Sequence, residues 1–351
     1  MGCKIPPCRV LNPVREILMI TDSILKYTRE YPLSDLHIHT DKPFAIRVNG
    51  SIESFEDDLV NREDIEEFID AFLRSELADT FAEYSDVDLV VEIEEFRFRA
   101  NIYNTAKGPS VALRKIESEI PTLEMINLPS AARQKLDSRN GLILVTGPTG
   151  SGKSTTLAAM INKINDEKND HIITIEDPIE YIHEDQKCII SQREVGRDTH
   201  SFAHALRAAL REDPDVILVG ELRDLETIQL ALTAAETGHL VFGTLHTSGA
   251  PNTINRIIDA CPPQQQDQVR AQLSQSLVMV ITQVLLKRTD GSGRVAAFEV
   301  MITNAAVKNL IRENKVFQIT SIMQTALAEG MMTMDRAISD LVQSGVATHE
   351  R

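Results

Sequence analysis

A glycine-rich loop is the feature of this sequence that most directly predicts a chemistry. Residues 147–154 read Gly-Pro-Thr-Gly-Ser-Gly-Lys-Ser and match the pattern G-x-x-x-x-G-K-[ST], with an additional glycine at position 150. Glycines let successive N–H groups turn toward an anion, and the dipole of a following helix adds positive potential there. The pattern therefore predicts a nucleoside-triphosphate site whose phosphate-binding residues are Gly147, Pro148, Thr149, Gly150, Ser151, Gly152, Lys153, Ser154 and Thr155.

Two side chains of this loop have expected roles of their own. Lys153 is expected to reach the β- and γ-phosphates, and the Ser154 hydroxyl is expected to ligate Mg²⁺. Hydrolysis also needs a positioned water, a group that orients it, and positive charge against the developing oxyanions. The rest of the chain offers candidates for each of these functions.

Glu221 is the candidate for the group that activates water. It follows an apolar run at 215–219 and Gly220, and a strand beside the phosphate loop can deliver an acid near the γ-phosphate. Gly220 stands where many such ATPases have an aspartate for the metal. We therefore expect Glu221 to act as general base or to orient the water. The alternative is a glutamate that only stabilises the start of a helix through its dipole.

A second acidic segment is the candidate for the metal site. Glu176 and Asp177 end the apolar run at 171–175, and Pro178 stops the strand. The two acids should emerge at the carboxyl edge of the sheet, where ligands bind. We expect them to contact Mg²⁺ and its waters, partly through indirect contacts. The alternative is an ordinary turn rich in acids.

Histidine and arginine supply further candidates. His246 ends the apolar run at 240–245, where its imidazole can contact the γ-phosphate, although a histidine at a strand end can also be structural. Arg97 and Arg99 lie two residues apart and so share a strand face, and Arg114 lies on a neighbouring strand. Such a face can reach a neighbouring subunit's triphosphate, but composition alone favours a solvated strand face.

These residues need a sheet to position them. From residue 131 to 351, apolar strands alternate with amphipathic helices, a pattern typical of a parallel sheet covered on both faces. We expect strands at 142–146, 171–175, 187–191, 215–219, 240–245 and 294–301. We expect helices at 153–165, 201–212, 224–237 and 252–259, a long helix at about 267–287, and a wholly helical tail from 304.

The first part of the chain, residues 1–130, is predicted to be a smaller α/β domain with a linker. Its expected elements are a helix at 14–29, strands at 35–39 and 44–48, a helix at 62–75, strands at 88–94, 96–103 and 111–116, and a linker at 117–130. A chain of 351 residues is long enough for two cores.

Composition excludes several classes of protein. No stretch approaches 18 uninterrupted apolar residues, so no membrane-spanning helix is predicted. The four cysteines form no C-x-x-C pair, which favours reduced thiols over a zinc site or a disulfide framework. The net charge of −16 argues against a chain that simply coats nucleic acid. A translocase of nucleic acid stays a rival, although 5% aromatic residues and no tryptophan offer few stacking platforms.

The order of the motifs resembles one known family. Segments 147–155, 175–180, 210–224 and 238–247 resemble the Walker A, Asp, Walker B and His boxes of the type II/IV secretion ATPases. The resemblance covers nearly the whole chain and is greatest to the PilT-like retraction ATPases of type IV pili. That subfamily has a motif Ala-Ile-Arg-Asn-Leu-Ile-Arg-Glu, from which residues 306–313 differ at two positions. The long extra N-terminal region and four-cysteine zinc motif usual in pilus-extension and type II secretion ATPases are not found in this sequence.

The resemblance implies a fold, a reaction and partners. It implies a PAS-like first domain, a RecA-like P-loop second domain and a ring of six subunits. It implies that Arg97, Arg99 and Arg114 complete a neighbour's site. It further implies a cytoplasmic motor that is peripheral at the inner membrane and retracts the pilus. This motor would dock on an integral-membrane platform protein at the pilus base, and residues 306–313 would couple hydrolysis to that partner. Pilus assembly and type II secretion stay open, because sequence alone does not fix a direction of work. A subunit that binds ATP but barely hydrolyses it is a further alternative, against which Lys153 and Glu221 speak.

Overall fold

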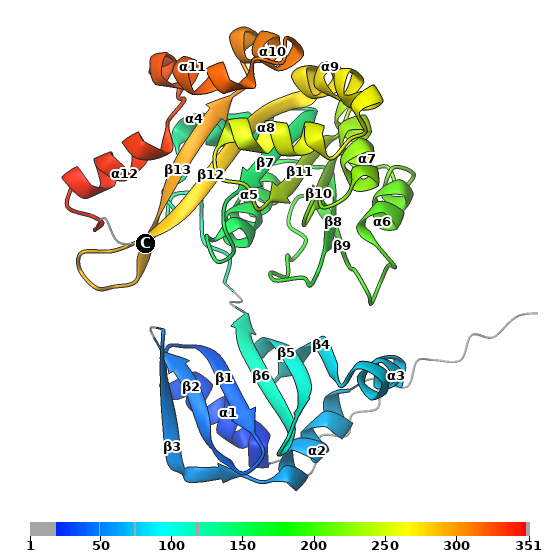
Figure 1. Cartoon of the computed structure of the whole chain (residues 1–351), viewed down its shortest axis with the longest axis vertical. Helices are drawn as coiled ribbons and strands as arrows, with labels where there is room; N and C mark the ends of the chain where they lie inside the picture. Colours follow the sequence, from blue (N-terminus) through cyan, green and yellow to red (C-terminus); the bar gives the residue numbers. More distant parts are fainter. Residues whose placement is uncertain (1–18, 49, 74, 117–118, 349–351) are drawn as a thin grey trace, which may run out of the picture. The chain divides into compact units, whose positions relative to one another are not determined.

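The chain forms two compact units. The computed structural model describes residues 19–48, 50–73, 75–116 and 119–348, shown in Figure 1. Contacts divide the chain into Met1–Ser118 and Glu119–Arg351. The division falls near the start of the predicted linker, 117–130, and the rest of that segment belongs to the second unit, because Leu123 and Leu128 are buried in its core. The predicted helix residues 14–18, together with Cys3 and Cys8, lie outside the described residues.

The first unit is an antiparallel sheet with helices packed on one face. The strand order is β3-β2-β1-β6-β5-β4. Ile24 and Phe68 from the helices join Leu36, Phe98 and Leu113 from the strands in one buried core. The elements are α1 (Met19–Glu30), β1 (Leu33–His39), β2 (Lys42–Val48), β3 (Ser51–Val60), α2 (Arg62–Phe72), α3 (Ser75–Tyr84), β4 (Asp86–Ile93), β5 (Phe96–Thr105) and β6 (Gly108–Ile116).

Two features of the first unit differ from the sequence prediction. Strand β3 was not expected, because it is a mostly exposed edge strand in which only Val60 is buried and no apolar alternation appears. The predicted helix at 62–75 ends at Phe72, and a separate helix, α3, follows it. Asn61 begins α2 by accepting a hydrogen bond from the Asp64 N–H with its side chain.

The second unit is built on a seven-stranded sheet of order β13-β12-β7-β11-β10-β8-β9. All neighbouring strands are parallel except the antiparallel pair β12–β13. The strands are β7 (Gly141–Thr146), β8 (His171–Glu176), β9 (Ile189–Glu194), β10 (Val216–Val219), β11 (Leu240–Leu245), β12 (Leu277–Lys287) and β13 (Arg294–Ile302). Strand β9 extends further toward its carboxyl end than the predicted 187–191.

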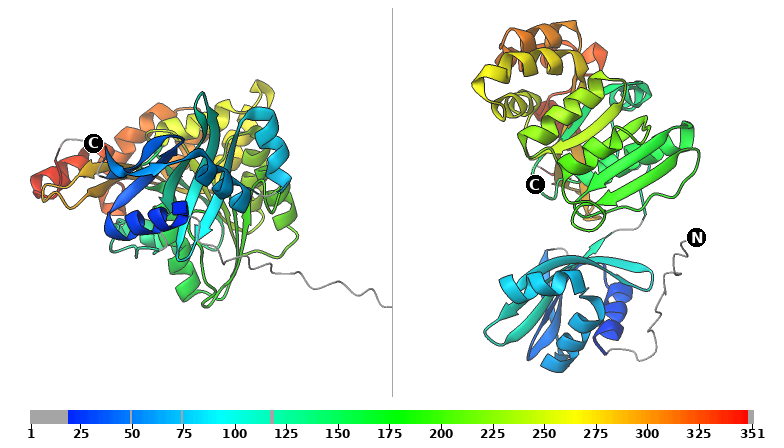
Figure 2. Two further views of the ribbon diagram at one scale, coloured as in Figure 1. Left: turned by 90° about the horizontal axis from the view of Figure 1, so that it is seen from below. Right: turned by 90° about the vertical axis from the view of Figure 1, so that its right-hand side faces the viewer.

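Helices alternate with these strands as predicted for the α/β class. They are α4 (Ser130–Gln134), α5 (Lys153–Glu167), α6 (Phe202–Ala209), α7 (Leu225–Glu236), α8 (Ala250–Asp259), α9 (Gln266–Ser276), α10 (Ala305–Arg312), α11 (Ile319–Thr325) and α12 (Met334–Gln343). Helices α9 and α10 lie side by side at one end of this unit (Figures 1 and 2). Cys188 and Cys261 are buried free thiols. None of the helices in the described part of the chain has the length and hydropathy needed to cross a bilayer.

The long helix predicted at 267–287 is wrong. Helix α9 ends at Ser276, and the chain continues as strand β12 between β7 and β13. Neighbouring residues of a strand point to opposite faces of the sheet, and both Val280 and Ile281 are fully buried. An apolar run of this kind suits a strand covered on both faces, and its valine and isoleucine content favours that conformation.

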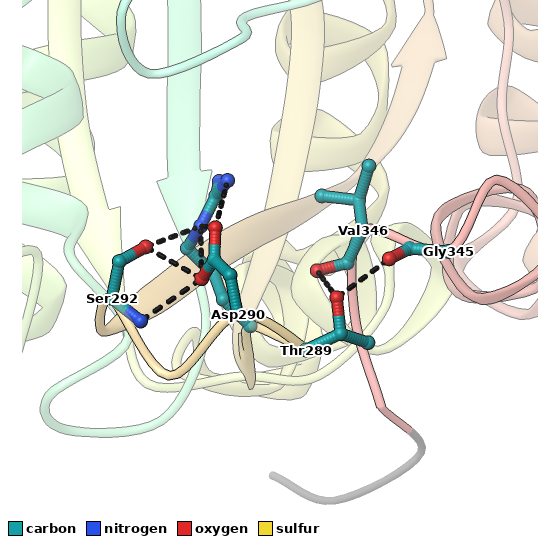
Figure 3. Close-up of polar contacts among 6 residues, drawn as sticks. Thr289, Asp290, Ser292, Gly345 and Val346 are labelled. Carbon is teal, nitrogen blue, oxygen red and sulfur yellow. Dashed lines mark hydrogen bonds and ion pairs between the residues drawn. The ribbon is translucent and has the colours of Figure 1, made fainter.

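The C-terminal part is helical as predicted, but not throughout. Met332 forms a bridge with Val300 of β13 instead of continuing a helix. Beyond α12, the chain returns to the tip of the β12–β13 hairpin, where the Thr289 hydroxyl donates to the Gly345 carbonyl at 2.6 Å (Figure 3). In the same tip, the Asp290 carboxylate accepts from the guanidinium of Arg288. The returning chain therefore holds the tip of the hairpin, while β12 itself pairs with β13 from Met279 to Lys287.

Candidate nucleotide-binding site

Four parallel strands end at one edge of the second unit's sheet. Thr146 at the end of β7 pairs with Leu245 at the end of β11, and Val219 at the end of β10 pairs with both Gly243 and Ile175. The segments that follow these strands carry the phosphate loop, His246, Glu221 and Asp177. The topology therefore gathers most of the predicted chemistry at one edge, as expected for a ligand site in an open α/β sheet.

The phosphate loop joins β7 to α5 in a conformation that needs glycine. Gly147, Gly150 and Gly152 have φ angles of 144°, 74° and 86°. Gly152 precedes the first helical residue of α5, and no side chain caps that helix start. The N–H groups at the start of α5 are therefore available to an anion, and the helix dipole favours a negative charge there.

Lys153 begins α5 and folds over the loop. Its ammonium group donates to the carbonyl oxygens of Gly147 at 3.0 Å and Pro148 at 3.1 Å. Burial lowers the pKa of Lys153, while the nearby carboxylates of Glu221 and Glu180 act in the opposite direction. The ammonium group therefore lies within electrostatic reach of both acids and at the mouth of the phosphate loop.

Glu221 lies between two cationic or polar partners. Its side chain is 18% exposed. One carboxylate oxygen accepts from Arg223 Nε at 2.6 Å, and the other lies 3.4 Å from His246 Nε2. The opposite ring nitrogen of His246, Nδ1, lies 3.5 Å from the Thr149 hydroxyl of the phosphate loop. The structure thus brings together the phosphate loop, Lys153, Glu221 and His246.

The backbone explains why residue 220 is glycine. A β-carbon at Gly220 would lie 3.2 Å from the Ile175 carbonyl oxygen and 3.3 Å from the Glu176 Cα. Those distances are tighter than ordinary van der Waals contacts, so a side chain would press on β8. The acid on β8, Glu176, instead lies directly beside this glycine.

Glu176 is largely buried at the end of β8. Its Oε1 accepts from the Thr174 hydroxyl at 2.6 Å and from the Gln192 side-chain amide at 3.3 Å. Burial raises its pKa to about 7, against these hydrogen bonds, which act to lower it. Asp177 is exposed and follows directly. Within the described residues, no three His, Cys, Asp or Glu side chains form a cluster suited to a metal.

Two residues missed from the sequence also contact the loop. The Tyr181 hydroxyl lies 3.0 Å from the Thr155 hydroxyl at the start of α5. The sequence feature that could have identified Tyr181 is its position directly after the acidic segment 175–180. Gln283 on β12 donates to the Ser151 carbonyl. It was missed because the segment 267–287 was predicted to be helical, although its valine, isoleucine and threonine content indicated a strand.

The three predicted arginines belong to the first unit. Arg99 on β5 pairs across the sheet with Arg114 on β6. The Arg114 guanidinium donates to Asp35 at 2.9 Å, Arg99 lies 3.8 Å from Asp88, and the Arg97 guanidinium donates to Glu92 at 3.2 Å. The side chains of Arg99 and Arg114 are 48% and 68% exposed, so both are accessible on this unit.

Comparison with known proteins identifies the family. Residues 82–351 match the family model described as type II/IV secretion system protein. The chain belongs to this family. It is 51% identical over 306 residues to a twitching motility protein of Neisseria gonorrhoeae, covering 87% of this chain and 82% of the relative.

Two further similarities extend over almost the whole chain. The type IV pilus retractation ATPase PilT of Pseudomonas aeruginosa is 47% identical over 328 residues, which cover 93% of this chain and 95% of PilT. A crystal structure of the pilus retraction motor PilT with bound ADP matches with a TM-score of 0.87 at 47% identity, covering 95% of each chain. These similarities support the predicted fold class, in which a RecA-like ATPase domain follows a smaller α/β domain.

Proposed function

We propose that this chain is an ATPase motor that powers the retraction of type IV pili. The observation that carries the proposal is the arrangement of Glu221 and His246 beside the phosphate loop, in a chain that is 47% identical to a pilus retraction ATPase over 93% of its length. The geometry supports hydrolysis of ATP, and the relatives support the mechanical use of that hydrolysis.

In the proposed reaction, water attacks the γ-phosphorus, the bond to the β,γ-bridging oxygen breaks, and ADP and phosphate leave. Glu221 orients the attacking water and accepts its proton. The Arg223 and His246 contacts hold the Glu221 carboxylate in one orientation. Lys153 and the N–H groups of the loop stabilise the charge that develops on the phosphate oxygens.

The donor set at the sheet edge fits Mg²⁺, which neutralises charge on the β- and γ-phosphate oxygens when it is bound. The Ser154 hydroxyl would hold the ion, with Glu176 and Asp177 contributing directly or through water. A small set of protein oxygens suits Mg²⁺, because this ion keeps several waters and is otherwise bound by substrate phosphates.

We further propose that six subunits form a ring and that Arg97, Arg99 and Arg114 contact the triphosphate of a neighbouring subunit. The exposure of Arg99 and Arg114 on one sheet face supports this role. Guanidinium groups supplied by a neighbour can stabilise a phosphoryl-transfer transition state, which would make hydrolysis depend on assembly.

Mixing two inactive variants tests this dependence. Arg99→Ala/Arg114→Ala keeps the phosphate loop but lacks the arginines, whereas Lys153→Ala keeps the arginines but lacks the loop lysine. Each variant alone should hydrolyse little ATP, and a mixture should regain activity at the mixed interfaces. Mixtures that form mixed rings by native mass spectrometry yet stay inactive at every ratio would contradict the contact between subunits.

The proposed location is the cytoplasmic side of the inner membrane, where the motor would dock on the platform protein at the pilus base. Helix α10 buries Val307 and Ile311 against the second unit's core, while Ala306, Asn309 and Arg312 are exposed. One face of this helix therefore packs internally, and the other supports a role in coupling to the platform protein.

Gene deletion followed by a pilus count tests the direction of work. Cells that lack the gene should become hyperpiliated and immobile, and wild-type protein should restore motility, whereas Glu221→Gln should not. Bald cells after deletion would instead favour the rival function, pilus assembly. Unchanged piliation together with loss of a secreted protein would favour type II secretion.

A further inference from the structure

Gln283 is a buried polar residue in the middle of an apolar strand. It lies on β12, is 1% exposed, and follows a run of buried residues from Met279 to Thr282. Its side-chain amide Nε2 donates to the Ser151 carbonyl oxygen at 2.5 Å, across 132 positions of sequence. That carbonyl lies within the phosphate loop. Strand β12, which carries none of the four motifs described above, therefore contacts the loop through Gln283.

Two of the three loop glycines pack directly on Gln283. A β-carbon at Gly147 would lie 2.4 Å from the Gln283 carbonyl oxygen, and one at Gly152 would lie 3.1 Å from Gln283 Nε2. By contrast, no atom lies within 4 Å of the corresponding position at Gly150. The backbone at residue 283 therefore leaves no room for a side chain at Gly147, whereas the close contact at Gly152 is with the end of the Gln283 side chain.

The strand pairing fixes Gln283 at this level of the loop. Thr282 pairs with Thr146, the last residue of β7, and their hydroxyl oxygens lie 3.0 Å apart. Gln283 is consequently held beside Gly147, the first residue of the loop. Lys153 directly follows Gly152, and its ammonium group donates to the Gly147 carbonyl. The contacts of residue 283 with both glycines therefore also constrain the backbone position of Lys153.

The Gln283 side chain is poorly satisfied as a core residue. Its Oε1 is buried and has no hydrogen-bond partner, and the same holds for the Ser151 hydroxyl oxygen. Burying an amide oxygen without a partner is unfavourable, and an apolar side chain of similar size would avoid this. Folding stability therefore does not account for glutamine at this position.

We propose that Gln283 is a positioning residue that holds the phosphate loop in its anion-binding shape and thereby sets the affinity for nucleoside di- and triphosphates. The inference rests on the proposed ATPase function but not on the direction of pilus movement. The N–H groups of the loop bind the phosphates before and during hydrolysis, so a looser loop weakens both states alike and raises KM more than it lowers kcat.

Gln283→Met, which keeps the length but removes the amide, tests the inference. We expect the KM for ATP and the Kd for ADP to rise about tenfold, with kcat changed by less than about threefold. The melting temperature should stay the same or rise. The matched control is Ser274→Ala, which removes a buried hydroxyl that donates to the Ala271 carbonyl on α9, before the opposite end of β12; its melting temperature should fall while its KM stays unchanged. An unchanged KM and Kd in Gln283→Met would overturn the inference.

Gln283→Glu supplies a second readout. The ionised carboxylate of this variant lacks a proton to donate to the Ser151 carbonyl, whereas the protonated carboxyl has one. ADP affinity should therefore be lost at pH 8 and partly recovered at pH 6, relative to Gln283→Met at the same pH values. The absence of recovery would count against a hydrogen bond from residue 283. Failure of the wild-type protein to hydrolyse ATP would instead contradict the proposed function itself.

Discussion

His246 Nε2 lies 3.4 Å from Glu221 Oε1, while the other nitrogen of the same ring lies 3.5 Å from the Thr149 hydroxyl. The imidazole therefore links the acid that follows β10 with the loop that follows β7. Because Thr149 belongs to the phosphate loop, a change of loop conformation alters the contacts of this ring. This link supports the proposal that His246 orients Glu221 during hydrolysis.

Glu221→Gln is expected to separate nucleotide binding from turnover. The amide keeps the size of the side chain but cannot accept the proton of the attacking water. We expect kcat to fall by about 10²- to 10⁴-fold, with ATP affinity largely retained. Phosphate release and nucleotide titration measure the two quantities. The matched control is Glu226→Gln on α7, which removes an exposed acid that pairs with Arg207 and should leave kcat unchanged. Normal turnover in Glu221→Gln would remove this residue from its role.

His246→Asn is expected to reduce kcat by about ten- to a hundredfold with a smaller effect on KM, because Glu221 loses one of the partners that orient it. Steady-state kinetics measures both. His239→Asn is the control, since His239 lies next to the opposite end of β11 and its ring contacts the Ala234 carbonyl. Equal losses of kcat in the two variants would assign His246 a structural role instead.

Lys153→Met is expected to weaken ATP and ADP binding by about ten- to a hundredfold. The loss of a charge-assisted contact to the phosphates accounts for this size. Calorimetric titration of nucleotide measures it. Lys163→Met on the same helix is the control, because the Lys163 side chain is 43% exposed and forms an ion pair with Glu167. Undiminished affinity in Lys153→Met would show that the loop amides alone determine binding.

The raised pKa of Glu176 predicts a pH dependence of stability. Burial raises this pKa to about 7 in the folded protein from an ordinary value of 4.5. Between these values the folded state holds a proton that the unfolded chain has released. Stability should therefore fall as pH rises from about 4.5 to 7, by about 2–3 kcal/mol in total.

Urea denaturation without Mg²⁺ or nucleotide, at pH values from 5 to 8, measures this effect. The Glu176→Gln variant has no titrating group at this position. The unfolding free energy of the wild-type protein, relative to that of Glu176→Gln, should therefore fall as the pH rises. Parallel profiles for wild type and Glu176→Gln would show that this carboxyl is already ionised at low pH.

The sequence was sufficient to locate most of the candidate site. The glycine pattern identified the phosphate loop, and apolar runs followed by Glu176, Glu221 and His246 identified neighbouring strands whose ends meet at one edge. Periodicity works here because buried parallel strands give short apolar runs with polar residues directly after them. The contact of His246 with Thr149 could not be derived, because it depends on the curvature of the loop.

The errors have equally specific causes. The segment that became β12 is apolar on both faces, and such a run does not distinguish a buried strand from a buried helix by periodicity alone. That error concealed Gln283, since a residue assigned to a helix cannot be placed beside the loop. Strand β3 was missed for the opposite reason, because an exposed edge strand has no apolar pattern. The roles of Arg97, Arg99 and Arg114 in a neighbouring site stay a prediction.

The narrow space between Gly220 and β8 constrains how such motors can evolve. A β-carbon at 220 would lie 3.2 Å from the Ile175 carbonyl oxygen, so a side chain at this position requires β8 to shift by a few tenths of an ångström. An acid at 220 should therefore be accommodated only together with a small displacement of the end of β8.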